Sequence, residues 1–236
     1  MMKRTETPEV TAGVQRVALV DDHTFMREGM KQFIDSLDGF ECAWTAPNAT
    51  EALTLLEGDM PDVLVVDITL PGRSGLELIK DVHALHPNLP LLVLSMHEET
   101  LYAHRAIKAG AKGYLMKSAD YEVFERALRK VAAGKLWLSE DIADNILQAF
   151  TSGTSPKGTD GLDALTDREF EVFQLLGEGR STPQIAEAMR ISPKTVDVHR
   201  ANIRAKLKLE DGAAVTRHAI RWGESNRLSA SSGRQP

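Results

Sequence analysis

The stretch Asp62-Val63-Leu64-Val65-Val66-Asp67-Ile68-Thr69-Leu70-Pro71-Gly72 decides the fold of the first half of the chain. Four consecutive apolar residues, three of them valine, are typical of a parallel strand that is buried on both faces. One carboxylate, Asp67, follows this run at once. Open parallel sheets place their ligands at the carboxyl ends of strands, where Asp67 is expected. A lone aspartate after a strand is more often a turn residue or a cap, so the rest of the chain must decide its role.

Four further apolar runs accompany this strand, and each of the five is followed by a stretch with helical periodicity. Strands are expected at about 17–20, 40–45, 62–67, 91–94 and 113–116, and helices at about 25–37, 48–56, 74–85, 101–109 and 121–131. Such regular alternation predicts an α/β doubly wound fold, with a five-stranded parallel sheet and helices on both faces, over residues 15–134.

Polar residues stand at the ends of four of these strands. They are Asp21, Asp22, Asp67, Ser95 and Lys117. Carboxyl ends of parallel strands share one edge, so these side chains can converge there. Three carboxylates in one place raise each other's pKa unless a cation is present, and such oxygen ligands suit Mg²⁺. A hydroxyl and a lysine opposite them supply what a phosphoryl group on Asp67 would need.

Residues 16–133 resemble a response-regulator receiver domain through the strand-end residues and Tyr114. The resemblance implies a flavodoxin-like fold in which a sensor histidine kinase phosphorylates Asp67. It implies that Mg²⁺ is bound by Asp22, Asp67 and the backbone carbonyl of Thr69, and that Asp21 contributes to the site through a water molecule. It also implies that Ser95 and Tyr114 form a switch pair and that Lys117 contacts the phosphate.

The charge of the chain is uneven. Residues 1–150 hold 15 basic and 23 acidic residues, a net charge of −8, whereas residues 151–236 hold 13 and 11, a net charge of +2. The positive charge gathers in Ser192 to Lys208, where five basic residues face one acidic residue, Asp197. This segment follows a tight turn, Arg190-Ile191, between two short helical patterns, which predicts a helix-turn-helix with a basic second helix.

The second half divides into a connecting segment and a helical domain. Residues 135–161 are expected to be a linker that contains a helix. Residues 151–163 are rich in Thr, Ser and Gly and lack apolar periodicity, which is typical of a flexible linker. Thr166 and Glu169 form a capping-box pattern that opens the first helix of an all-α four-helix domain over 162–224. The ends, residues 1–14 and 225–236, are expected to be disordered.

Residues 162–223 resemble the LuxR-type DNA-binding domain. The matching segments are Leu165-Thr166-x-Arg168-Glu169-x-Glu171-Val172, Gln184-Ile185-Ala186 and Ser192-Pro193-Lys194-Thr195-Val196-x-Val198-His199-Arg200. A receiver followed by this domain is the layout of NarL/FixJ-class response regulators. Two departures are Asp197, where the family often has a basic residue, and Glu210-Asp211-Gly212, where many relatives have Asn-Arg. The DNA-contacting candidates are Lys194, Thr195, Asp197, Val198, Arg200, Ala201, Arg204 and Lys208.

Composition limits the cellular setting. The single cysteine, Cys42, excludes an internal disulfide and a cysteine-based zinc site, which fits a reducing cytoplasm. Residues 1–13 lack the apolar core of a signal peptide, and no apolar run reaches the length of a membrane span, so no membrane partner is expected.

These observations predict a cytoplasmic, phosphorylation-controlled transcription regulator rather than an enzyme. Its expected partners are a sensor histidine kinase, double-stranded promoter DNA, RNA polymerase and, on phosphorylation, a second copy of the chain. One alternative is a DNA-binding regulator whose receiver serves protein contacts without phosphorylation. Another is a phosphatase of the haloacid-dehalogenase kind, which needs a second acid two residues after the nucleophile, where this chain has Thr69.

Overall fold

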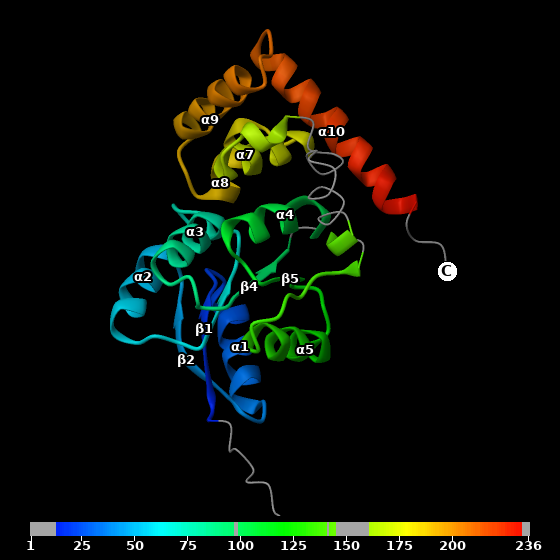
Figure 1. Ribbon diagram of the computed structural model, residues 1–236. Helices are drawn as coiled ribbons and strands as arrows, with labels where there is room; N and C mark the ends of the chain where they lie inside the picture. Colours follow the sequence, from blue (N-terminus) through cyan, green and yellow to red (C-terminus); the bar gives the residue numbers. More distant parts are fainter. Residues whose placement is uncertain (1–12, 97–98, 141, 145–160, 233–236) are drawn as a thin grey trace, which may run out of the picture.

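The computed structural model describes residues 13–96, 99–140, 142–144 and 161–232 (Figure 1). Its first half alternates strands and helices as the sequence predicts. The strands are β1 (Gln15–Val20), β2 (Phe40–Ala46), β3 (Val63–Val66), β4 (Leu91–Ser95) and β5 (Gly113–Met116). The helices are α1 (Thr24–Ser36), α2 (Ala49–Gly58), α3 (Gly75–Leu85), α4 (Glu99–Ala109) and α5 (Tyr121–Ala132).

All five strands are parallel and lie in the order β2-β1-β3-β4-β5. β3 lies at the centre, and its four residues are fully buried because helices cover both faces of the sheet. Leu64 and Val66 pack with α2, α3 and α4, whereas Val63 and Val65 pack with α1 and α5. The predicted doubly wound sheet is therefore confirmed, with β3 as its buried centre.

Strand register brings the carboxyl ends of the strands to one edge. Val20 is paired with Val66, and the amide of Asp67 donates to the carbonyl of Val20 at 2.9 Å. On the other side of β4, the amide of Lys117 donates to the carbonyl of Ser95 at 2.7 Å. The polar residues that follow β1, β3 and β5 are thus fixed by the ladder itself.

The second half is helical. It consists of η1 (Leu162–Ala164), α7 (Asp167–Gly177), α8 (Thr182–Met189), α9 (Pro193–Lys206) and α10 (Gly212–Ser232). Thr166 and Glu169 form the predicted capping box at the start of α7. Between α8 and α9, Arg190 adopts a left-handed conformation with φ of 53°, which makes the tight turn of the helix-turn-helix. Val196 and Ile203 of α9 are fully buried and form its inner face.

The segment after α5 pairs with the sheet, and the last helix extends into the expected tail. Trp137, in the first part of the expected linker, forms a parallel bridge with Gly113 of β5, whereas residues 145–160 of that linker lie outside the described residues. The tail was expected to begin at residue 225, but α10 continues to Ser232. A serine-rich composition lowers helix propensity only slightly, and neither proline nor glycine follows Gly223 within the helix.

The helical half packs against the receiver half through α7 and α8, which lie over α3 and α4 (Figure 1). Tyr102 of α4 and Phe170 of α7 meet edge to face with ring centroids 5.3 Å apart. Of the helices in the described part of the chain, none is both long and apolar enough to cross a membrane.

Candidate functional site

A buried carboxylate pair surrounds one lysine at the carboxyl edge of the sheet. Lys117 Nζ lies 2.7 Å from Asp67 Oδ2 and 2.7 Å from Asp21 Oδ2. The three side chains are at most 3% exposed. They come from the residues directly after β1, β3 and β5, so the sheet register positions them. The structure therefore brings together three of the residues that the sequence singled out.

Asp22 and His23 complete an acidic cluster. One ligand atom from each of Asp21, Asp22, His23 and Asp67 lies within 4.8 Å of the others. His23 Nδ1 is 2.7 Å from Asp22 Oδ1, and the His23 amide donates to Asp21 Oδ1 at 2.8 Å. Several carboxylate oxygens on a small buried surface are the donor set that Mg²⁺ prefers, so the residues present fit that ion. His23 was not predicted from the sequence as a member of this cluster, although its position directly after Asp21-Asp22 could have indicated it.

Burial shapes the electrostatics of this cluster. It raises the pKa of Asp67 to about 6, although the Lys117 ammonium opposes that rise. Burial alone would lower the pKa of Lys117, but the charges of Asp67 and Asp21 outweigh it and leave that pKa raised. Lys117 is thus held protonated between two carboxylates, where it can offset charge that is added to Asp67.

The segment after β3 fixes the orientation of Asp67. The amide of Thr69 donates to Asp67 Oδ1 at 3.1 Å. α3 begins directly against this segment, and the Gly75 amide donates to the Ile68 carbonyl at 2.8 Å. A Cβ atom on Gly75 would lie 1.9 Å from the backbone oxygen of Asp67. Only glycine allows α3 to start so close to the carboxylate that it supports.

Ser95 and Tyr114 are the expected switch pair. Ser95 is the last residue of β4, and Tyr114 lies within β5. Both are buried, at 0% and 1% exposure. Burial raises the pKa of the Tyr114 hydroxyl, and a side-chain hydrogen bond with Ser95 acts in the opposite direction. The two hydroxyl groups therefore already interact inside the protein, next to the acidic cluster.

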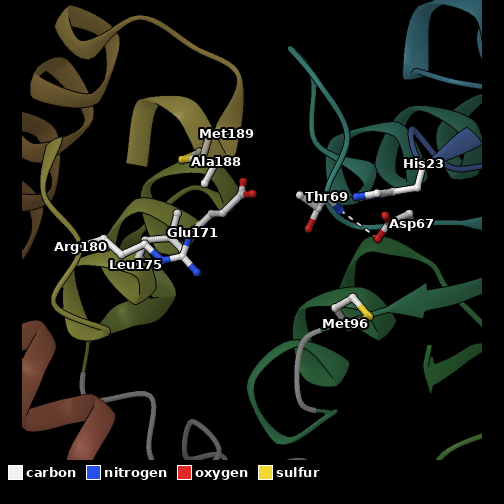
Figure 2. A pocket seen from close by; sticks show the side chains of 9 residues that line it. All are labelled: His23, Asp67, Thr69, Met96, Glu171, Leu175, Arg180, Ala188 and Met189. Atoms are coloured by element: carbon white, nitrogen blue, oxygen red, sulfur yellow. Dashed lines mark hydrogen bonds between the residues drawn. The ribbon is translucent and has the colours of Figure 1, made fainter. Parts of the chain in front are cut away.

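A cavity of about 190 Å³ separates this cluster from the helical half (Figure 2). His23, Asp67, Thr69 and Met96 line it from the receiver side. The facing wall is built by Glu171, Leu175, Arg180, Ala188 and Met189 of α7, α8 and the segment that joins them. The Asp67 side chain thus faces a small space whose far wall belongs to the other half of the chain.

Arg168 makes the most deeply buried polar contact between the two halves. Its Nη2 donates to the carbonyls of Leu70 at 2.9 Å and Gly72 at 2.6 Å, and its Nη1 donates to Glu171 at 2.7 Å. Burial raises the pKa of Glu171, and the charge of Arg168 opposes that rise. The segment just after Asp67 is therefore tied to the start of α7.

Further charged contacts join the two halves. Lys80 Nζ lies 2.5 Å from Asp167, and Arg105 donates to the carbonyls of Leu162 and Leu165 at 2.6 and 3.1 Å. Arg190 Nη1, in the turn of the helix-turn-helix, lies 2.6 Å from Asp22 Oδ2. Sequence reasoning missed all of these contacts. The only signal was the run of charged residues at the start of α7, which a capping box explains in part.

The candidate DNA-contacting residues divide by exposure. Six of the eight are exposed, namely Lys194, Asp197, Val198, Ala201, Arg204 and Lys208. Thr195 is half-buried, and its hydroxyl lies 2.7 Å from that of Ser192, the N-cap of α9. Arg200 is half-buried and donates to the Thr182 hydroxyl at 2.9 Å. The packing of the two halves therefore leaves most of this surface open.

Two family models match the chain. Residues 17–129 match the response regulator receiver domain, and residues 163–219 match the bacterial regulatory proteins of the luxR family. A nitrate/nitrite response regulator protein homolog from Haemophilus influenzae is 34% identical over 212 residues, which are 90% of this chain and 98% of that protein.

Solved structures resemble it as well. A LuxR-family two-component response regulator from Aurantimonas sp. is 34% identical with a TM-score of 0.54, over 59% of this chain and 99% of that one. RcsB from Salmonella enterica serovar Typhimurium, bound to promoter rprA with the phosphomimetic BeF3−, has a TM-score of 0.57 at 20% identity, over 87% of this chain and 98% of that one. At that identity the likeness concerns the fold alone.

The receiver sheet, the helix-turn-helix domain and these similarities agree with one another. The match to the Haemophilus influenzae protein extends over nearly the full length of both chains. The likeness therefore includes both domains and their order. Members of this family work with histidine kinases, bind DNA and regulate transcription under the control of phosphorylation. The chain belongs to the family of two-component response regulators that join a receiver domain to a LuxR-type DNA-binding domain.

Proposed function

We propose that Asp67 is the phosphoacceptor through which a sensor histidine kinase controls this regulator. One observation carries the proposal: a nearly buried carboxylate lies 2.7 Å from a lysine that also contacts Asp21, on the wall of a small cavity. The carboxylate must be both reactive and compensated when it gains charge. Lys117 and the cluster around it supply that compensation.

The transfer step exchanges one phosphorus bond for another. A carboxylate oxygen of Asp67 attacks the phosphorus of a phosphohistidine, the P–N bond breaks, and the imidazole nitrogen of the kinase keeps the electron pair. Asp21, Asp22 and Asp67 would hold Mg²⁺, which when bound neutralises the charge of the transferring oxygens. The Thr69 amide and the start of α3 at Gly75 hold the carboxylate in place for the attack. The Thr69 carbonyl is proposed as a further ligand on family resemblance.

Lys117, Ser95 and Tyr114 then respond to the product. We expect the Lys117 ammonium to move from the Asp67 carboxylate to a phosphoryl oxygen, because that oxygen carries more charge. The Ser95 hydroxyl is the next donor, and Tyr114 follows it because the two side chains are hydrogen-bonded. Such a movement biases a two-state equilibrium of α4 and α5.

The DNA-binding role is proposed for the exposed face of α9. Asp197, Val198 and Ala201 would face base edges in the major groove. Lys194, Thr195, Arg200, Arg204 and Lys208 would face phosphates. Arg200 would first have to leave Thr182, so it is the least direct of these contacts.

The partners and the cellular setting are proposed on the same basis. A homodimer formed on phosphorylation would hold two α9 helices one turn of DNA apart. Promoter binding of that kind brings RNA polymerase within reach. One half-buried cysteine and no disulfide among the described residues suit the cytoplasm, where the kinase would meet the receiver.

Incubation with acetyl phosphate and Mg²⁺, followed by intact mass spectrometry, tests the proposal. The parent protein should gain one phosphoryl group, and Asp67→Asn should gain none because it lacks the nucleophile. Asp62→Asn is the matched control, since it removes a carboxylate from the opposite end of β3. Persistence of the adduct in Asp67→Asn would show that another residue is the acceptor. Failure of the parent to react would favour the alternative of a receiver that works without phosphorylation.

A further inference from the structure

The turn of the helix-turn-helix reaches into the acidic cluster of the receiver. Arg190 Nη1 lies 2.6 Å from Asp22 Oδ2, while the other oxygen of Asp22 lies 2.7 Å from His23. The Asp22 side chain is only 7% exposed. Asp22 Oδ2 is thus engaged by a residue of the DNA-binding domain, whereas the buried Oδ1 lies beside His23 without a hydrogen-bond partner among the described residues.

This ion pair is not explained by stability. The Arg190 side chain is 56% exposed, and exposed ion pairs contribute little to the free energy of folding. Its position is more informative. Arg190 is the left-handed residue that ends α8, so its guanidinium is carried by the same turn as Ala188 and Met189, which line the cavity beside Asp67.

A guanidinium and a divalent cation repel each other when both lie beside the same carboxylate. Mg²⁺ requires short contacts, about 2.0–2.1 Å, in near-octahedral geometry. A guanidinium held 2.6 Å from Asp22 Oδ2 occupies that oxygen and adds positive charge where the ion would bind. Binding of the ion at Asp22 is therefore favoured when Arg190 moves away and takes its positive charge with it.

We infer that Arg190 competes with Mg²⁺ for Asp22, so that packing of the DNA-binding domain on the receiver and loading of the phosphorylation site oppose each other. The inference rests on the proposed magnesium site. Because coupling between two binding events is reciprocal, the ion weakens the domain contact by the factor with which the contact weakens ion binding. The packed domain leaves the α9 face exposed, so this contact acts on loading of the receiver rather than by covering the DNA-reading residues.

Isothermal titration of Mg²⁺ into the full-length protein tests this competition. Arg190→Gln removes the charge and keeps most of the side-chain length. Arg180→Gln is the matched control, because Arg180 lines the same cavity but pairs with Glu178 at 3.0 Å rather than with Asp22. Asp22→Ala reports whether the measured heat belongs to the acidic cluster. Circular dichroism melts of all four proteins establish that they are equally folded.

The inference expects the Kd for Mg²⁺ to fall roughly two- to fivefold in Arg190→Gln, the range that an exposed ion pair allows. The Kd of Arg180→Gln should stay at the parent value. Equal affinities in the parent, Arg190→Gln and Arg180→Gln would overturn the inference. An equal gain in affinity in both arginine variants would also overturn it, because that gain would reflect the general loss of positive charge. If the parent and Asp22→Ala gave the same titration, the proposed magnesium site itself would be refuted, and the competition with it.

Discussion

Replacement of Arg168 by alanine should release the DNA-binding domain from the receiver. Two hydrogen bonds from Arg168 Nη2, to the carbonyls of Leu70 and Gly72, cross between the halves at 2.9 and 2.6 Å. Arg168 is 6% exposed, so solvent screens these bonds little. Hydrogen bonds to a charged group contribute about 1.5–3 kcal/mol each, which gives about 3–6 kcal/mol for the pair. The lower value shifts the packing equilibrium by more than about 100-fold.

Glu171 adds to this effect. In the packed arrangement it is buried, and Arg168 is its ion-pair partner at 2.7 Å. Without Arg168, the buried carboxylate would lack compensation, whereas separation of the domains returns it to water. The cost therefore falls on the packed state and not on the DNA-binding domain alone.

Energy transfer between two dyes measures the change. Leu85→Cys and Arg221→Cys place exposed labelling sites on α3 and α10. Cys42 can stay, because burial raises the pKa of its thiol to about 11 and leaves little thiolate at neutral pH. Arg168→Ala should lower the transfer efficiency, while Arg180→Ala should leave it at the parent value. Unchanged efficiency together with a lower unfolding temperature would refute this reasoning, since Arg168 would then stabilise only its own helix through Glu171.

Three further predictions concern the two sites. Lys117→Ala should still fold, but its phosphorylated form should show no gain in DNA affinity, because the cation that contacts the phosphoryl group is gone. Fluorescence anisotropy with and without phosphorylation measures this gain, and a normal gain would show that Lys117 does not have that role. The affinity for Mg²⁺ should weaken about tenfold per pH unit below about pH 6. The pKa of Asp67 is about 6, so its carboxyl group is protonated at lower pH and cannot bind the ion. Titrations of Mg²⁺ from pH 5 to 7.5 measure this dependence, and an affinity that does not change with pH would contradict it. Asp197→Ala should change the preferred base at one half-site position, with a loss of about 1–3 kcal/mol of discrimination between bases, whereas Arg204→Ala should weaken binding to all sequences alike. Binding-site selection distinguishes the two effects. Identical base preferences for Asp197→Ala and the parent would show that Asp197 is only a solvated charge.

The receiver could be predicted well because its signals are local. The run of four apolar residues at Val63–Val66 identifies a strand buried on both faces, and the polar residue after each strand inherits its position from the sheet. Lys117 and Asp67 are 50 residues apart, yet parallel pairing alone brings them to the same edge. The helix starts at Ser74 and Thr166 follow from capping boxes that three or four residues encode.

The contacts between the domains could not be predicted in this way. Arg168 reaches a carbonyl 98 residues away, and no periodicity indicates which charged face of α7 another domain covers. Asp167, Arg168 and Glu171 look like ordinary solvated helix charges in the sequence, but all three are buried. The left-handed conformation of Arg190 is equally hidden, because arginine has no local preference for it.

The sheet order has a consequence for the newly made protein. Asp67 directly follows the central strand β3, and its lysine partner directly follows the last strand β5, 50 residues further along the chain. At 5–20 residues per second, the ribosome needs roughly 3–10 s to make that segment. During this interval the nascent chain carries Asp21 and Asp67 without the ammonium group that compensates them. Under the role proposed for Asp67, a phosphoryl group added to a growing chain would meet no lysine until β5 has joined the sheet, so the response to phosphorylation is restricted to receivers that have finished folding.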